Sequence, residues 1–176
     1  MLKTIAVNLS LILATAFGGT LGDTSEITSL RNKTSFNIYV PSYSGSASSF
    51  EIKVPTDIKQ TEVPYVMVNY FDANGSYVFG VSQLENNSFM TKEITEFDVK
   101  KNTKKTRSYK EKVILKPQGE LVSINGNKGW YEAYVGNKAT GGKLRWVISN
   151  TYIEPDTANL SKSSLVKVAE SMKKVK

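Results

Sequence analysis

Apolar and polar side chains alternate over much of the chain, with the period of two that is typical of strands burying one face. Within residues 34–40, Phe36, Ile38 and Val40 fall on one face. The same alternation predicts strands at residues 50–54, 130–135 and 143–148. A proline follows each of the first two segments and ends the strand, because proline cannot donate to a strand ladder.

The clearest hairpin spans residues 65–81. Two β-branched and aromatic runs, 65–71 and 77–81, flank the sequence Asp72-Ala-Asn-Gly75, whose Asn-Gly pair suits a tight reversal with positive φ. Both faces of the first run are apolar. We therefore expect this hairpin to lie in the centre of a two-layer core or to line a cavity.

Shorter runs complete the predicted sheet. We expect short or edge strands at 88–90 and 94–99, and further strands at 113–115 and 121–124. Gly141 and Gly142 indicate a hairpin between 130–135 and 143–148. Tyr152 and Ile153 are expected to close the sheet.

One amphipathic helix is predicted after residue 160. Ser161 is a suitable N-cap, and Leu165, Val168, Ala169 and Met172 fall on one helical stripe. The stripe is narrow and aliphatic, which favours packing against the sheet over a partner-binding groove. The sequence thus predicts an α+β fold, with a mainly antiparallel sheet and a C-terminal α-helix packed on one face.

The N-terminus has the pattern of an export signal. Lys3 precedes an apolar run over residues 5–17, which contains the small residues Ala14-Thr15-Ala16. The run is shorter than the ~20 residues of a comfortable membrane span. Cleavage after Ala16 is expected, with Gly22 as the second choice. An uncleaved anchor and a buried N-terminal helix are the alternatives.

This interpretation divides the chain into three parts. Residues 1–22 are a signal peptide or N-terminal anchor and lead-in, residues 23–33 a flexible segment, and residues 34–176 a single α+β domain. The expected location is secreted or extracytoplasmic, in the cell envelope. No transmembrane span is expected once the signal is cleaved.

The 176 residues include neither cysteine nor histidine. A Ser-His-Asp triad, a thiol nucleophile and a thiolate or histidine metal site are therefore excluded in this chain. Paired carboxylates offer a route to glycoside hydrolysis. The candidates occur singly on ordinary strands and are Glu96, Asp98, Glu120 and Glu132. We expect no enzyme and no cofactor.

The formal net charge is +7, and positive residues concentrate between residues 100 and 116, where Glu111 is the only acidic one. This segment is interpreted as an exposed loop or a long hairpin tip. It is either a solvated segment that discourages edge-strand aggregation or a contact for anionic lipid or polymer. The candidate contacts are Lys100, Lys101, Lys104, Lys105, Arg107 and Lys110. Nucleic acid is not expected, because only Tyr109 can stack on bases.

Aromatic side chains are the candidates for ligand contact. Those expected to face a ligand are Tyr65, Tyr77, Trp130 and Tyr131, whereas Tyr70 and Trp146 are expected in the core. The leading hypothesis is a non-enzymatic binding or interaction domain that holds an apolar or lipid-like ligand on the sheet. The alternative is an envelope adaptor that contacts anionic polymer or membrane through residues 100–116. Candidate partners are an envelope protein, a lipid or an anionic cell-wall polymer.

The order of several motifs resembles a known family. They are Phe36-Asn-Ile-Tyr-Val-Pro41, Val66-Met-Val-Asn-Tyr70, Gly129-Trp-Tyr-Glu-Ala133, Leu144-Arg-Trp146 and Val168-Ala-Glu-Ser171. Together they resemble the extracytoplasmic domain of unknown function 4367 of Gram-positive bacteria. The resemblance implies a curved antiparallel sheet packed on helix, related to lipoprotein-carrier and sigma-regulator sensor folds. Such relatives look like binders of acyl chains or protein signals.

Overall fold

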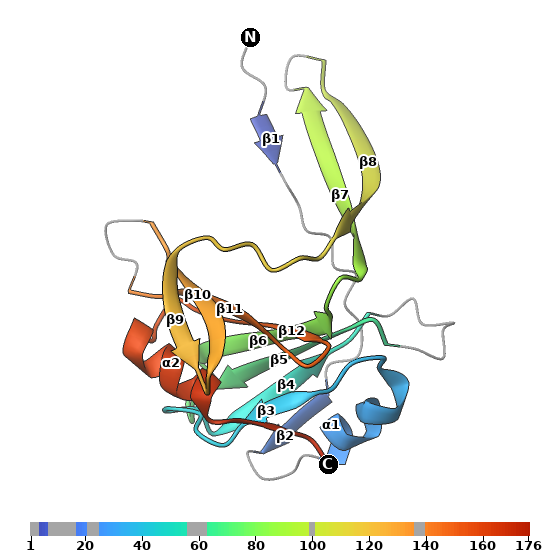
Figure 1. Ribbon diagram of the computed structural model, residues 1–176. Coiled ribbons are helices and arrows are strands. Elements are labelled where there is room, and N and C mark those ends of the chain that lie inside the picture. Colours follow the sequence, from blue (N-terminus) through green and yellow to red (C-terminus); the bar gives the residue numbers. More distant parts are fainter. Residues whose placement is uncertain (1–3, 7–16, 21–24, 56–62, 99–100, 136–139) are drawn as a thin grey trace.

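The computed structural model describes residues 4–6, 17–20, 25–55, 63–98, 101–135 and 140–176. Its body is an eight-stranded antiparallel sheet with the strand order β2-β4-β5-β6-β12-β11-β10-β9 (Figure 1). The strands are β2 (Phe17–Thr20), β4 (Ser49–Lys53), β5 (Tyr65–Phe71), β6 (Tyr77–Glu85), β9 (Glu120–Ile124), β10 (Asn127–Ala133), β11 (Gly142–Ile148) and β12 (Thr151–Thr157).

Two smaller sheets accompany the main one. One contains β1 (Thr4–Ala6), β7 (Phe89–Asp98) and β8 (Thr103–Lys112), and the other pairs β3 (Tyr39–Pro41) with β13 (Met172–Lys174). The helices are α1 (Ser25–Leu30), the 3-10 turn η1 (Arg31–Lys33) and α2 (Lys162–Glu170). The fold is thus mostly antiparallel sheet with few helices, one of them C-terminal, as the sequence predicts.

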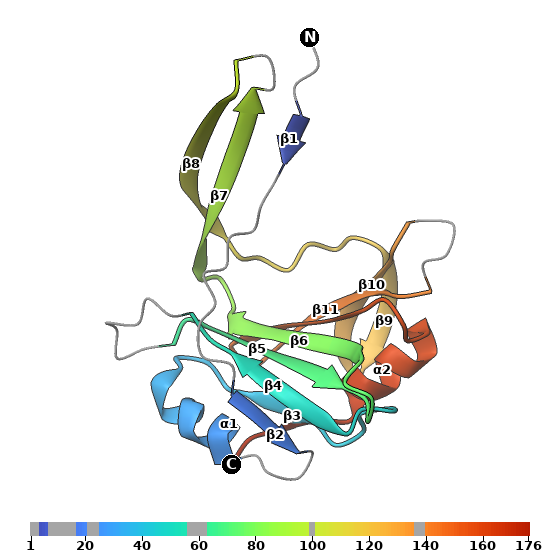
Figure 2. The ribbon, with the colours of Figure 1, turned by 180° about the vertical axis from the view of Figure 1, so that it is seen from behind.

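Strands β7 and β8 form a long hairpin, the arm, that stands away from the body (Figures 1 and 2). At its base, Asn87 N–H donates to the Val113 carbonyl at 3.0 Å, and Val113 N–H donates to the Ser88 carbonyl at 2.8 Å. From Val113 the chain crosses the body to β9, and this connection, residues 113–119, is the crossover segment.

The alternation of β5 separates two hydrophobic clusters. Val66, Val68 and Tyr70 are buried in the main core, together with Ile27 of α1 and residues of α2. The buried residues of α2 are Leu165, Val168 and Ala169. The intervening β5 residues Tyr65 and Met67 belong to a smaller cluster with Leu84 and Tyr152. Both faces of β5 are therefore occupied.

The hairpin of residues 65–81 is confirmed as β5 and β6. Asp72 Oδ1 accepts from the N–H groups of Asn74 and Ser76, each at 2.9 Å, and Gly75 has a φ of 76°. The predicted helix is also confirmed: Ser161 is its N-cap, and its side chain accepts from Ser164 N–H at 3.2 Å. Met172 lies beyond the helix, in β13.

Three strand predictions are wrong. Residues 34–38 are not in a strand although Phe36 and Ile38 are buried, because alternation reports burial and not strand pairing. Residues 113–115 form no strand and belong to the crossover segment. Tyr152 and Ile153 do not close the sheet, since β12 lies inside it between β11 and β6.

Two further expectations are corrected. The sequence predicts a loop or hairpin tip for residues 100–116, whereas 103–112 form β8 because each residue pairs with one of β7. The sequence predicts a flexible segment over 23–33, whereas α1 and η1 lie there and Ile27, 1% exposed, holds α1 in the core. Most of the predicted signal segment lies outside the described residues.

Candidate functional site

A pocket of about 600 Å³ lies over the centre of the main sheet, on the side of the smaller cluster. Strands β5, β6, β11 and β12, the end of β8, the crossover segment and Tyr134 line it. The apolar lining consists of Met67, Leu84, Val113 and Ile114. The polar lining includes Tyr65, Ser82, Tyr134, Lys143, Arg145, Tyr152, Glu154 and Asp156. The pocket therefore has both an apolar and a strongly polar part.

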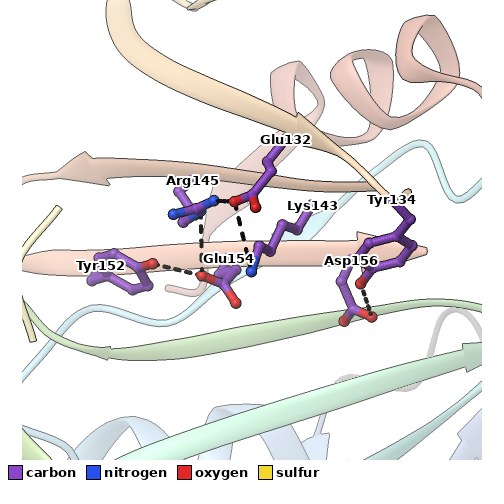
Figure 3. A network of polar contacts seen from close by, with 7 residues as sticks. All are labelled: Glu132, Tyr134, Lys143, Arg145, Tyr152, Glu154 and Asp156. Carbon is purple, nitrogen blue, oxygen red and sulfur yellow. Dashed lines mark hydrogen bonds and ion pairs between the residues drawn. The ribbon is translucent and has the colours of Figure 1, made fainter. Parts of the chain in front are cut away.

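Arg145 is the centre of the polar part, as Figure 3 shows. It is only 6% exposed, and its Nη2 donates to Glu132 Oε2. Its Nε lies 3.8 Å from Glu154 Oε2, while Lys143 Nζ lies 3.7 Å from Glu132 Oε2. A buried guanidinium requires such neighbouring carboxylates, because desolvation of an unpaired charge is costly.

The Nε–H of Arg145 is not satisfied by this arrangement. Within the described part of the chain it is buried without a hydrogen-bond partner. The ion pair with Glu154 is too long at 3.8 Å to be a hydrogen bond. Buried polar groups are nearly always hydrogen-bonded, so this donor still requires an acceptor oxygen.

Tyrosine hydroxyls hold the carboxylates of β12. Tyr152 OH donates to Glu154 Oε2 at 2.6 Å, and burial, followed by the charge of Glu154, raises the pKa of Tyr152. Asp156 Oδ2 accepts from Tyr134 at 3.3 Å and from Tyr77 at 3.4 Å. Burial raises the pKa of Asp156, although both tyrosine hydrogen bonds oppose this shift.

Two tyrosines at the pocket stay protonated well beyond neutral pH. Burial is the main cause that raises the pKa of Tyr65 to about 12, and its hydroxyl lies 3.1 Å from Ser82 Oγ. Burial, followed by the charge of Asp156, raises the pKa of Tyr134 to about 12. Both hydroxyls therefore keep their proton at neutral pH: Tyr134 donates it to Asp156, and the Tyr65 hydroxyl shares a hydrogen bond with Ser82.

Strand register brings the charged residues together. In β11, Lys143 and Arg145 alternate with Leu144 and Trp146, which are buried in the main core. Lys143 stands opposite Glu132 of β10 and opposite Asp156 of β12. Because successive strand residues point to opposite faces, these charged side chains share the face of the pocket.

The sequence-predicted ligand contacts are only partly brought together. Tyr65 lines the pocket, whereas Tyr77 is not among the lining residues and donates to Asp156 Oδ2 at 3.4 Å. Trp130 stands opposite Arg145 on β10 and is half-buried, but it is not among the lining residues. Tyr131 is turned away, since it is buried in the main core. Tyr70 and Trp146 are in the core, as expected.

The candidate catalytic carboxylates are dispersed. Glu96 and Asp98 lie on the arm, where Glu96 pairs with Arg107, and Glu120 of β9 pairs with Lys162. Only Glu132 joins the network. Among the described residues, no group of three or more acidic side chains is placed to hold a metal ion.

The predicted basic contacts lie on the arm. Lys104, Lys105, Arg107 and Lys110 are in β8, and Lys101 is at the hairpin tip. Lys100 lies outside the described residues.

Sequence reasoning missed the centre of the network: Arg145, Tyr152, Glu154 and Asp156. A usable signal existed, because Arg145 stands between Leu144 and Trp146 in a strongly apolar strand. A charge at such a position indicates either an exposed face or a buried ion pair. The strand by itself does not say which, because the carboxylates come from two other strands.

Comparison with family models found no match for this chain, and no curated protein or solved structure matches it significantly. None of the helices in the described part of the chain is long and apolar enough to cross a membrane.

Proposed function

We propose that this protein is a non-enzymatic, secreted or cell-envelope binding domain whose sheet pocket holds a lipid-like amphipathic molecule. The observation that carries the proposal is the combination of an apolar lining with the buried, unsatisfied Nε–H of Arg145. The expected ligand has an apolar part and an oxygen-rich head group. This narrows the expectation of an apolar or lipid-like ligand to an amphipathic one, because a charged lining is unsuited to a purely apolar molecule.

The size and composition of the pocket support this ligand class. Its volume of about 600 Å³ lies within the roughly 300–1,000 Å³ that is common for small-molecule sites. Met67, Leu84, Val113 and Ile114 offer apolar contacts to a hydrocarbon chain. Arg145 and Lys143 offer donors to an acidic or carbonyl oxygen, while Glu154 offers an acceptor to a hydroxyl group.

The arrangement of the carboxylates supports binding over catalysis. Glycosidases place two carboxyl groups on either side of the scissile bond. Here Glu154 and Asp156 lie side by side on one strand, and Arg145 contacts both Glu132 and Glu154. The guanidinium therefore lies where a substrate would need to enter between those carboxylates.

The proposal includes two expectations from the sequence. One is export directed by the N-terminal segment. The other is the resemblance to the domain of unknown function 4367, with a curved sheet and α2 packed on one face. Burial of Leu165, Val168 and Ala169 in the core supports the packing of α2, and the resemblance itself stays a prediction.

Native mass spectrometry tests the pocket. The full chain and the form starting at Phe17 are purified gently, and their spectra are recorded before and after organic extraction. A titration with a dansyl-labelled fatty acid follows. We expect an extractable co-purified mass and saturable fluorescence enhancement.

A blocking variant locates the ligand. Ser82 is a small residue of the pocket lining, so Ser82→Phe fills the pocket without removing a charge. Ser163→Phe is the matched control, because Ser163 is exposed on α2. Probe affinity is expected to fall at least about ten-fold in the first variant and to stay unchanged in the second. A clean apo mass with equal probe affinity in both variants refutes the proposal.

A second candidate function is favoured by the arm. All residues of β8 except Glu111 are exposed, and the strand carries the basic residues Lys104, Lys105, Arg107, Lys110 and Lys112. This supports an envelope adaptor that contacts an anionic polymer or membrane through the basic segment.

A further inference from the structure

We infer that one face of the arm docks on an anionic lipid membrane through lysines and two exposed phenylalanines. The inference rests on the second candidate function, names its partner class and selects the residues that make the contact. It does not depend on the pocket.

The register of the arm defines two rows of side chains. One row contains Phe97 opposite Lys104, Thr91 opposite Lys110 and Phe89 opposite Lys112, and it is called the lysine row. The other row, called the mixed row, contains Lys105 opposite Glu96. Arg107 and Glu111 also belong to the mixed row. Residues directly opposite each other share a face in an antiparallel pair.

Charge is distributed unequally between the rows. In the mixed row, Arg107 pairs with Glu96 at 3.3 Å, and Glu111 pairs with Lys116 at 3.2 Å. In the lysine row, no described carboxylate forms an ion pair with Lys104, Lys110 or Lys112. By backbone register, Glu93 lies opposite Ser108, so the positions of this row comprise three lysines and one glutamate.

The lysine row also carries exposed apolar surface. Phe89 is 64% exposed and Phe97 is 43% exposed. They lie near the two ends of the row, so they are separated along the full length of the arm. Aromatic side chains beside lysines are typical of protein surfaces that lie in the interface of anionic membranes.

The position of the arm leaves this row accessible. The arm stands away from the main sheet in both views, and β8 is its outer strand (Figures 1 and 2). Lys112, at the base of the row, also lines the pocket. The lysine row thus extends from the pocket to the hairpin tip.

Two alternative explanations, a strand that is simply solvated and a strand that binds a soluble polyanion, each account for the lysines of this row but not for its phenylalanines. Charges at a sheet edge oppose aggregation, so solvation is sufficient reason for the lysines of β8. It gives no reason for two exposed phenylalanines on the same row. A soluble polyanion would attract the lysines too, but it offers no apolar phase for Phe89 and Phe97. An anionic membrane accounts for both the lysines and the exposed phenylalanines.

Vesicle co-sedimentation tests the inference. The probes are vesicles of phosphatidylcholine alone, and vesicles of equal parts phosphatidylcholine and phosphatidylglycerol. The protein is tested as the full chain and again from Phe17, so that binding through the apolar N-terminal run is distinguished from binding through the arm. We expect binding to the anionic vesicles that weakens as salt is raised.

Neighbouring residues provide matched variants. Lys104→Gln changes the lysine row and Lys105→Gln the mixed row, with the same loss of charge one residue apart. A lysine near an anionic membrane contributes about five-fold in affinity, so the first variant is expected to bind about five-fold more weakly than the second. The double variant Phe89→Ser, Phe97→Ser is expected to bind anionic vesicles at least about ten-fold more weakly. Tyr109→Ser, on the mixed row, is expected to change vesicle affinity little.

Each competing mode of binding has a distinct outcome. No binding to anionic vesicles, or equal binding to neutral ones, overturns the inference. Equal losses of vesicle affinity in Lys104→Gln and Lys105→Gln overturn the choice of the lysine row over the mixed row. Polyphosphate serves as the soluble probe: if it binds while vesicles do not, the membrane inference fails and the anionic-polymer candidate stands. The pocket variant Ser82→Phe is expected to keep full vesicle binding.

Discussion

Gln83 connects β3 to the main sheet, and its replacement by leucine is a sharp test of the fold. Its side chain is fully buried on β6. Oε1 accepts from Tyr39 N–H at 2.7 Å, and Nε2 donates to the Tyr39 carbonyl at 2.9 Å. One glutamine thus satisfies both backbone groups of a residue that is itself 6% exposed.

The cost of Gln83→Leu follows from these two bonds. Each buried backbone group left unpaired costs about 1–3 kcal/mol, so the pair costs about 2–6 kcal/mol. Leucine fills a similar volume and recovers about 1 kcal/mol through its greater apolar surface. We therefore expect a loss of about 3 kcal/mol in the free energy of unfolding.

Urea unfolding followed by tryptophan fluorescence measures this loss, since Trp146 is 2% exposed in the folded protein. Gln118→Leu is the control, because Gln118 is exposed, and it should change stability by less than about 0.5 kcal/mol. A loss below about 1 kcal/mol for Gln83→Leu would refute the reasoning and assign the position of β3 to its pairing with β13.

In the variant Gln83→Glu, the free energy of unfolding is expected to depend on pH. The introduced carboxyl accepts from Tyr39 N–H at any pH, but it donates to the Tyr39 carbonyl only when protonated. Its pKa is therefore raised in the folded state. Stability close to that of the wild type is expected below the unfolded pKa of about 4.3, with a loss as pH rises through the folded pKa. An unfolding profile parallel to the wild type would contradict the bonding scheme.

Three further changes have defined outcomes. Ser161→Ala removes the cap on Ser164 N–H and should cost about 1 kcal/mol in urea unfolding; no change would argue against a stabilising cap. Gly141→Ala places a Cβ well inside van der Waals contact of the Thr157 carbonyl oxygen, so soluble yield or melting temperature should drop sharply, and a wild-type melting curve would contradict this contact. Burial raises the pKa of Asp156, so its ionisation lowers stability as pH rises through the folded pKa. Asp156→Asn should therefore gain melting temperature over the wild type above that pKa and gain none below about pH 3.9, and a gain that persists at low pH would rule out this cause.

The N-terminal processing site is a separate prediction. Cleavage after Ala16 keeps β2, whose residues Phe17–Thr20 pair with β4, whereas cleavage after Gly22 removes it. We expect the intact mass of the exported protein to begin at Phe17. A mass that begins at Asp23 would mean that the sheet tolerates loss of this edge strand.

The local pattern of the sequence determined much of the fold. Alternation and turn residues identified β4, the β5–β6 hairpin, β9, and the hairpin of β10 and β11. The capping residue and aliphatic stripe identified α2. These features depend on residues close together in the chain, and the period of side-chain direction is fixed by backbone geometry.

Only the tertiary structure decided which segments become neighbours. β12 pairs with β6, a strand far from it along the chain, and so lies inside the sheet where the sequence suggested an end. The pocket likewise depends on which strands pair, because Glu132, Arg145 and Glu154 come from three strands and are brought together by the register of those strands. Alternation gives the face of each residue, but it does not identify the strand across from it. That choice is made by hydrogen bonding and burial between distant segments, which no single stretch of sequence contains.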